Sequence, residues 1–339
     1  LDKNGNKMSK RLGNGVDPAD VTSKWGADVL RLWVASADYA QDVSISDNIL
    51  KQVSDAYRRF RNTFRFLLGN LSDFDDQANA VSNWDDLEPI DQYMMAKTAQ
   101  LLSDVEQAYD SFKFNGVYRA VYDFVNDLSS VYMDVTKDRL YSESPDSPRR
   151  RAVQTVLFNI LEVLVRVLSP ILSFTADEVW ECYPEAMRNR EGRVCNVQLA
   201  GWPHRSDFVP ALPGKAAEDK VLAAFGGALE VRDVVTKALE DARGAKVINK
   251  SQEATVSVTA PQATLDALSA FDASVFEELF IVSGVTFAAG NELACEVKPA
   301  EGDKCPRCWN YRELGGNANH ADVCQRCGDA LDAIGFTEE

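Results

Sequence analysis

The sequence predicts a mainly α-helical protein, in which an antiparallel helical bundle is followed by a small α+β unit and a four-cysteine zinc knuckle. Apolar residues recur at steps of three and four over much of residues 46–183, which is the period of an amphipathic helix. Alternation of apolar and polar residues, the period of a strand, appears later in the segment EATVSVT. Two C-x2-C pairs near the end of the chain complete the pattern.

Length and charge limit what the protein can be. At 339 residues, the chain is long enough for two or three domains. Its formal net charge of −16 argues against a nucleic-acid partner, although a large acidic protein can present a basic stripe on one face. The most apolar stretch, residues 156–174, contains Glu162, Arg166 and Pro170, so we expect a buried bundle helix and no membrane contact.

The first helices are signalled by their caps. Residues 1–16 form a loop rich in Gly, Asn and Lys, and Asp17-Pro18 then supplies an N-cap and a first-turn proline. The resulting short helix ends near Gly26, and a second helix, ADVLRLWVAS, follows directly. From Ser46 one apolar stripe predicts a long helix, with its members at Leu50, Val53, Tyr57, Phe60, Phe64, Leu67 and Leu71.

Further helices are indicated at about 89–112, 115–140 and 148–168, and a shorter one runs from Pro170 to about Cys182. Long amphipathic helices joined by polar connections are typical of an antiparallel bundle, which we place at residues 46–183. Four prolines mark residues 184–215 as a surface linker.

The segment after the linker predicts a small α+β unit at residues 216–299. A helix is expected at about 216–243, then the strand EATVSVT and a short helix near 262–272. The stretches LFIVSGVTFA and LACEVK are expected to be the second and third strands.

The four cysteines at residues 300–339 predict one structural Zn²⁺. Each C-x2-C forms a tight knuckle, and two knuckles close a tetrahedron that leaves no coordination position for water. A redox pair and a ligand role for His320 are less favoured readings. The pattern also favours a reducing compartment, and the isolated cysteines are expected to be buried or half-buried thiols. The ligands are Cys305, Cys308, Cys324 and Cys327; the isolated thiols are Cys182, Cys195 and Cys295.

The opening loop, GNKMSKRLGN, is the second informative segment. Two lysines flanking Met-Ser suit a mobile arm that follows charge developing on a leaving pyrophosphate. Taken alone, such a basic loop is more often a solvated loop.

Residues 7–11, Lys-Met-Ser-Lys-Arg, resemble the KMSKS signature of class I aminoacyl-tRNA synthetases, with Arg11 in place of the final Ser. The phrases GADVLRLWVASADYAQDVSIS, DAYRRFRNTFRFLLGNLSDF, DLSSVYMDVTKDRLY, SPILSFTADEVW and KCPRCWNY are similar to the isoleucyl family in particular. Valyl and leucyl relatives share the loop signature but are not expected to end in a four-cysteine knuckle.

The resemblance implies a ligase that activates isoleucine with ATP and Mg²⁺ and transfers it to tRNA(Ile), as a cytoplasmic monomer. It implies that Lys10 contacts ATP while Lys7 and Ser9 shape the catalytic loop, at the end of a catalytic domain (1–45). A HIGH-type motif is absent, since the two histidines lie at 204 and 320. We therefore expect roughly the last third of the enzyme, inactive alone, with the isoleucine pocket upstream. A stand-alone tRNA-binding module without catalysis is the alternative.

Contacts with tRNA are expected from the bundle, which the resemblance makes anticodon-binding, and from the zinc segment. Arg58, Arg61 and Arg65 share the face opposite the apolar stripe and suit phosphate contacts, or equally a solvated ionic face. Trp309 suits stacking on a base, or equally a cover for the zinc core. The three arginines at 149–151 stand at a helix start, where cations are unfavourable, which hints at a polyanion.

Overall fold

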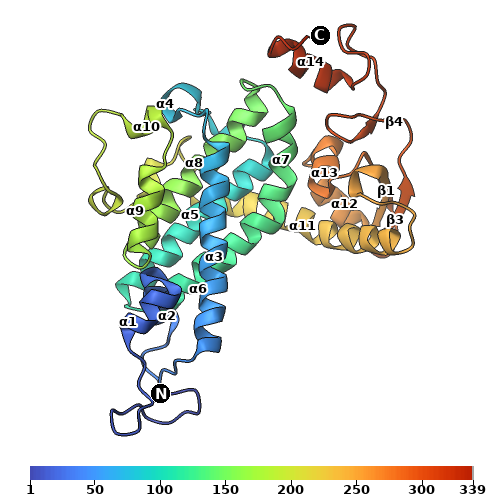
Figure 1. Cartoon of the computed structure of the whole chain (residues 1–339). Coiled ribbons are helices and arrows are strands. Elements are labelled where there is room, and N and C mark those ends of the chain that lie inside the picture. Colours follow the sequence, from blue (N-terminus) through green and yellow to red (C-terminus); the bar gives the residue numbers. More distant parts are fainter. Residues whose placement is uncertain (338–339) are drawn as a thin grey trace. The chain divides into compact units, whose positions relative to one another are not determined.

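The computed structural model describes residues 1–337 and is mainly helical (Figure 1). Residues 338 and 339, the last two of the predicted zinc segment, lie outside the described part. The chain divides into two compact units, each assembled from separate stretches. Unit 1 comprises residues 1–82, 97–130 and 154–212, and unit 2 comprises residues 83–96, 131–153 and 213–339.

Unit 1 is a helical bundle with the opening loop at its beginning. Its α3 has every member of the predicted apolar stripe buried or half-buried, and Ser46 caps its first turn by accepting from the amide of Ile49. The predicted bundle is thereby confirmed. The helices that contribute are α1 (Pro18–Trp25), α2 (Ala27–Ser36), α3 (Asp47–Asn70), α4 (Asp76–Asn79), part of α5 (Pro89–Asp110), α6 (Phe114–Asp127), part of α8 (Pro148–Leu168) and α9 (Ser173–Glu181).

Helices α1 and α2 begin and end where the caps predict. Asp17 accepts a hydrogen bond from the amide of Ala19, and Gly26 separates the two helices at φ 93°, which glycine adopts readily. From α2, the buried Asp28 accepts hydrogen bonds from the amide and hydroxyl of Thr175 at 2.7 and 2.6 Å. Because α9 has no side-chain cap of its own, Asp28 caps it from a distant part of the sequence.

The helix predicted at 115–140 is present and contains one irregular turn. Helix α6 continues through a π turn (Leu128–Tyr132) into α7 (Met133–Ser142). The predicted linker contains short turns of helix at α10 (Glu185–Arg188), Val197–Leu199 and Arg205–Asp207. Among residues 1–337, no helix is both long and apolar enough to cross a membrane.

The isolated cysteines differ from expectation in two of three cases. Cys295 is half-buried, but Cys182 and Cys195 are exposed. Cys182 is the C-cap residue that follows α9 and Cys195 lies in the irregular segment after α10, so neither side chain faces the bundle core.

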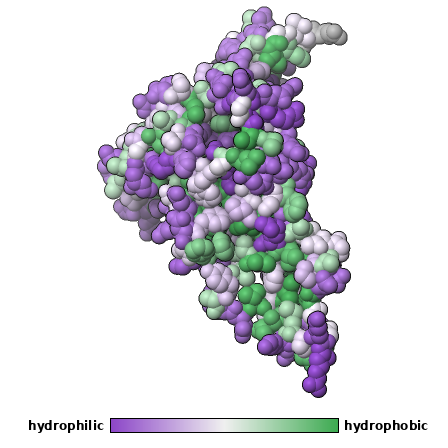
Figure 2. All heavy atoms as spheres, turned by 90° about the vertical axis from the view of Figure 1, so that its left-hand side faces the viewer, coloured by the Kyte–Doolittle hydropathy of each residue, from purple (hydrophilic) through white to green (hydrophobic). Residues whose placement is uncertain are grey.

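Apolar side chains also reach the surface of unit 1. Figure 2 shows hydrophobic residues gathered over the part of the face that holds α1 and α2, next to the strongly hydrophilic opening loop. Exposed apolar side chains of these segments and the chain just after them are Leu12, Val16, Val34 and Tyr39.

Unit 2 contains a three-stranded sheet in the order β2-β1-β3. Strand β1 (Ala254–Ala260) pairs parallel with β2 (Gly284–Ala289) and antiparallel with β3 (Ala294–Pro299). Helices α11 (Lys215–Gly244), α12 (Gln262–Leu268) and α13 (Ala273–Phe280) contact the sheet. The buried side of β1 carries Ala254, Val256, Val258 and Ala260, as its alternating sequence predicts.

The prediction for LFIVSGVTFA was wrong in its first half. Leu279 and Phe280 end α13, Ile281 closes it in the left-handed conformation at φ 57°, and β2 starts only at Gly284. The short helix expected near 262–272 is present as α12, whereas α13, which follows it, was not foreseen. The run of apolar residues is buried in a helix, which periodicity over so short a segment does not distinguish from a strand.

Candidate functional site

The four cysteines converge on one point, as their spacing predicts. They lie on two knuckles, one between β4 (Asp303–Lys304) and β5 (Tyr311–Arg312) and one at the start of α14 (Gln325–Ala333). Their sulfur atoms are all within 4.8 Å of one another, and the Sγ atoms of Cys308 and Cys324 are 3.8 Å apart. Zn–S bonds of about 2.3 Å in a tetrahedron place two sulfurs about 3.8 Å apart. The donor set therefore fits a tetrahedral zinc ion.

The surroundings of the cysteines mark the site as structural. All four are buried, and their apolar cover comes from Val323, with Leu314 and Leu331 packed against it. His320 is not part of the cluster, and its Nε2 instead lies 3.3 Å from a carboxylate oxygen of Asp332. With four thiolate ligands and no open position, zinc here holds the chain together rather than activating water.

Each knuckle also presents one arginine to α7. Arg326 makes a two-armed ion pair with Asp138, and Arg307 donates to the backbone oxygen of Ser142. A zinc ion bound by four thiolates would carry a net charge of −2, which the two nearby guanidinium groups would partly compensate. Sequence reasoning missed both, although CPRC and CQRC place an arginine at the same position of each knuckle.

Trp309 is exposed and flanked by lysines rather than packed on the zinc core. The Nζ atoms of Lys250 and Lys304 lie 4.1 and 5.9 Å from the centre of its ring. The residue has φ 67° and leaves 48% of its surface accessible. Bulky residues rarely adopt this backbone conformation, and such strain is concentrated at functional positions. The lysines were not identified from the sequence.

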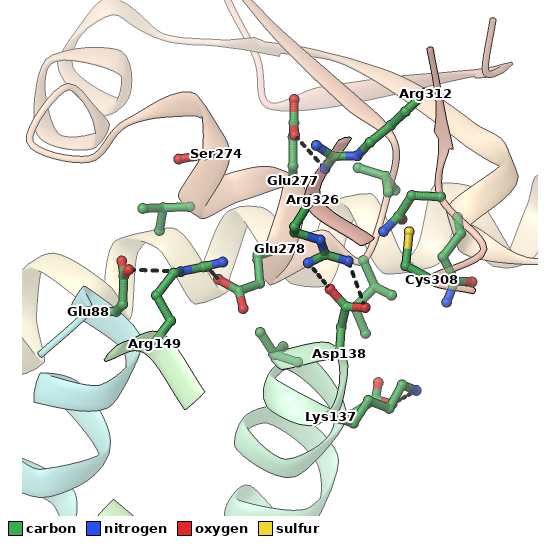
Figure 3. A pocket seen from close by; sticks show the side chains of 17 residues that line it. Glu88, Lys137, Asp138, Arg149, Ser274, Glu277, Glu278, Cys308, Arg312 and Arg326 are labelled. Atoms are coloured by element: carbon green, nitrogen blue, oxygen red, sulfur yellow. Dashed lines mark hydrogen bonds and ion pairs between the residues drawn. The ribbon is translucent and has the colours of Figure 1, made fainter. Parts of the chain in front are cut away.

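A cavity of about 280 Å³ lies beside the zinc knuckles within unit 2 (Figure 3). Nearly all the charged side chains that line it are paired with one another. Arg149 bonds to Glu88 and Glu278 at 3.0 and 2.9 Å, and Arg312 lies 3.7 Å from Glu277. The wall therefore offers both donors and acceptors of hydrogen bonds, but little uncompensated charge.

Beneath this wall lies a buried charged centre that the sequence did not reveal. Arg139 is 1% exposed and bonds to Asp91 at 2.9 Å and to both carboxylate oxygens of Glu278. Tyr132 donates to the other oxygen of Asp91 at 2.7 Å. Burial alone would lower the pKa of Arg139, but the attraction of Asp91 and Glu278 outweighs it and raises that pKa. The guanidinium therefore stays charged inside the fold.

Burial raises the pKa of Asp91 in turn, although Arg139 and Tyr132 both favour its charged form. Removing Arg139 would take away the counter-charge of the buried Asp91.

The arginines at 149–151 do not form a free cationic surface, so the hint of a polyanion there was wrong. Arg149 is held by the carboxylates of Glu88, Glu143 and Glu278, and Arg151 by Asp146 at 2.9 Å. Carboxylates from other segments compensate the cations, which the order of residues along one helix does not show.

Of the four arginines of α3, the three considered for tRNA contacts differ in their ion pairs. Arg61 makes a two-armed ion pair with Glu178 at 2.7 and 3.1 Å, which raises the pKa of Arg61. Arg58 lies 3.4 Å from Asp55 in an exposed pair. Arg65 is exposed and, within residues 1–337, has no ion-pair partner. The helix thus brings these three residues to one surface, and of the three only Arg65 has no ion-pair partner within residues 1–337.

The backbone of the opening loop packs against the rest of unit 1, and its cationic side chains are exposed to solvent. Met8 packs on a small apolar cluster that contains Val21, Ile45 and Leu50. Lys7, Lys10 and Arg11 are exposed, and in the part of the chain that the structure describes none has a carboxylate within ion-pair distance. Three uncompensated positive charges on an anchored loop are suited to a polyanionic ligand.

Comparisons with known proteins agree with these features. The model for the anticodon-binding domain of tRNA ligase matches residues 91–258, and that for class I tRNA synthetases (I, L, M and V) matches residues 1–46. The model for the zinc finger found in FPG and IleRS matches residues 302–329. The isoleucine–tRNA ligase of Geobacillus kaustophilus is 46% identical over 96% of this chain, and that of Symbiobacterium thermophilum is 42% identical over 98%.

Over nearly its whole length the chain is similar to isoleucine–tRNA ligases. It spans 36% of the length of each of these two ligases and corresponds to their C-terminal portion. Within this family match, the KMSKR loop falls in the class I segment and all four cysteines fall in the zinc-finger segment. Among solved structures, a leucyl-tRNA synthetase of Agrobacterium radiobacter K84 is only weakly similar, at 16% identity and a TM-score of 0.43 over 90% of this chain and 27% of that one.

Proposed function

We propose that this chain is the tRNA-binding and ATP-loop portion of an isoleucine–tRNA ligase, which activates isoleucine with ATP and transfers it to tRNA(Ile). The observation that carries the proposal is the presence, on one chain, of a KMSKR loop, an anticodon-binding family match and a four-cysteine zinc site. The domains we assign are the end of the catalytic domain (1–45), the anticodon-binding bundle (46–183), a linker (184–215), a small α+β unit (216–299) and a tRNA-contacting zinc segment (300–339).

The chemistry proposed for the loop is stabilisation of the leaving pyrophosphate. Lys10 contacts the phosphates of ATP, bound with Mg²⁺, and Lys7 and Ser9 shape the loop around them. A lysine is a point charge on a flexible stem, so it can follow negative charge as it develops. Arg11 adds a further cation at the position where the family signature has serine. The exposure of all three cations supports this role.

The proposed tRNA surface combines stacking with local positive charge. Trp309 stacks on an unpaired base, and Lys250 and Lys304 contact the neighbouring phosphates. Arg58, Arg61 and Arg65 form a second, phosphate-binding face, in which Arg65 is the residue without an ion-pair partner among residues 1–337. Such local patches allow a chain with a net charge of −16 to bind a polyanion. Zinc keeps the Trp309 surface folded and takes no part in the chemistry.

Experiment can distinguish two alternatives from this proposal. A stand-alone tRNA-binding module would have no need of a loop with three exposed cations, and a valyl or leucyl enzyme would differ in the amino acid it attaches. The isoleucine pocket is proposed to lie upstream of this portion, and the complete ligase to act as a cytoplasmic monomer.

Aminoacylation tests the proposal. A ligase that contains this chain together with the upstream part of its relatives should charge tRNA(Ile) with isoleucine, whereas the 339-residue chain alone should give no isoleucine-dependent ATP–pyrophosphate exchange. Charging with valine or leucine instead would assign the chain to the neighbouring enzymes. Exchange activity by the chain alone would contradict the proposed division of the active site.

Trp309→Ala tests the tRNA surface separately. Loss of a stacked base should weaken tRNA binding by about 1–3 kcal/mol, and Trp309→Phe should retain most of the affinity. Equal binding by the alanine variant would remove Trp309 from the interface.

A further inference from the structure

Asp2 and Asn14 close the base of the KMSKR loop. The Nδ2 atom of Asn14 donates to Oδ2 of Asp2 at 2.9 Å, between residues on either side of the signature. Both side chains are half-buried, whereas Lys7, Lys10 and Arg11 are exposed. The loop is therefore tied at its base while its charged side chains are free.

Asn14 also reaches into the signature itself. Its Oδ1 accepts a hydrogen bond from the amide of Ser9 at 2.9 Å, and its Nδ2 donates to the backbone oxygen of Lys7 at 3.4 Å. One carboxamide thus contacts the backbone at two positions of the loop. The carboxamide is suited to this because it offers both donors and acceptors.

Asp2 is held in place in its turn. Its Oδ1 accepts from the amides of Asn4 and Asn6, each at 2.9 Å. The preceding residue is fixed to the body of unit 1 through its backbone, because the amide of Ile45 donates to the oxygen of Leu1 at 3.1 Å. Together with the packing of Met8 on the apolar cluster, these contacts set the path of the loop backbone.

We propose that Asp2 and Asn14 are positioning residues, which hold the backbone at Lys7 and Ser9 so that the neighbouring lysines meet the phosphates of ATP. This inference rests on the proposed function. Neither side chain needs to contact ATP, because misplacing a catalytic group by about 1 Å can slow a reaction on the order of a hundredfold. The effect of losing them should therefore fall on the chemical step.

Hydrogen exchange tests the hydrogen bonds without any activity. In the 339-residue chain, Asn14→Ala should speed exchange of the Ser9 amide by about fivefold or more, as expected for loss of one hydrogen bond. Asn4→Ala is the matched control, because only the backbone amide of Asn4 bonds to Asp2. Unchanged exchange at Ser9 in Asn14→Ala would overturn the proposed contact.

A swap of the two side chains tests the pair. Asn14→Asp alone places two carboxylates in contact and should accelerate exchange at Ser9. Adding Asp2→Asn restores a carboxamide facing a carboxylate, so the double variant should return to within about threefold of the wild type. If the double variant instead exchanges the Ser9 amide faster than Asn14→Asp does, the two side chains are not in direct contact.

Kinetics of the complete ligase then test the positioning role. Asn14→Ala should lower kcat for isoleucine-dependent pyrophosphate exchange by about tenfold to a hundredfold with little change in KM for isoleucine, and the swap should recover most of it. If the wild-type ligase shows no such exchange, the proposed function fails while the hydrogen-exchange result still stands. If the wild type is active and Asn14→Ala equals it, the positioning role is wrong.

Discussion

Arg326, which lies between two of the zinc ligands, faces the carboxylate of Asp138 on α7 with both arms of its guanidinium. Arg307, at the same position of the other knuckle, donates to the backbone of Ser142 on the same helix. A zinc ion held by the four cysteines would join the two knuckles to each other, and the two arginines join them to α7.

Arg326→Ala should separate zinc binding from docking. The variant should retain one zinc per chain, since all four cysteines remain, but the docking of residues 303–333 should weaken by about 1–3 kcal/mol, as for hydrogen bonds to charged groups. Faster hydrogen exchange in α14, with unchanged zinc content by metal analysis, checks this. Arg58→Ala, which removes an exposed pair with Asp55, is the control and should leave α14 unchanged.

Removal of zinc should unfold only the last part of the chain. The segment has a small core made largely of the cysteines themselves, so it should lose its protection from hydrogen exchange when the metal is chelated. The bundle helices have their own buried core and should stay helical by circular dichroism. Loss of the bundle signal together with zinc would show that the two parts do not fold independently.

Arg139→Ala should be among the most damaging single substitutions in unit 2. It leaves the buried carboxyl of Asp91 without its counter-charge and leaves Glu278 with Arg149, and breaking such a buried pair typically costs about 3–5 kcal/mol. Hydrogen exchange of the β1 amides measures the stability of this unit. Lys137→Ala, which removes only a surface pair with Asp134, is expected to cost about 1 kcal/mol or less. Equal effects of the two substitutions would contradict the buried centre.

The carboxyl of Asp2 should titrate at unusually low pH. The side chain of Asn14 and the amides of Asn6 and Asn4 hold its pKa at about 2, below the ordinary value of 3.8. Because the folded-state pKa is lowered, the contribution of Asp2 to the loop is present above pH 3.8 and is lost as pH falls through about 2. Carboxyl NMR should show this midpoint, and Asn14→Ala should move it back toward 3.8. A midpoint near 3.8 in the wild type would contradict the hydrogen bonds.

Features that depend on local sequence were predictable. Asp17-Pro18 and Gly26 delimit α1, the period of three and four predicts the buried stripe of α3, and two C-x2-C pairs predict the metal site. Each of these follows from residues a few positions apart, or from a ligand spacing that admits few alternatives.

Features that depend on distant residues were not predictable from one sequence. Asp91, Arg139 and Glu278 read separately as ordinary surface charges of three helices, and only the fold brings them together. Asp28 likewise looks like a first-turn acid of its own helix but also caps α9. Helix α13 was missed because its apolar residues run on into the next strand, so no change of period marks the boundary.

Equilibrium binding of the zinc-loaded chain to tRNA tests the proposal that this chain is the tRNA-binding portion of an isoleucine–tRNA ligase. We expect a tRNA(Ile) transcript to bind more tightly than the same transcript with an exchanged anticodon, and chelation of zinc to weaken binding. Equal affinity for both transcripts, unaffected by chelation, would contradict it.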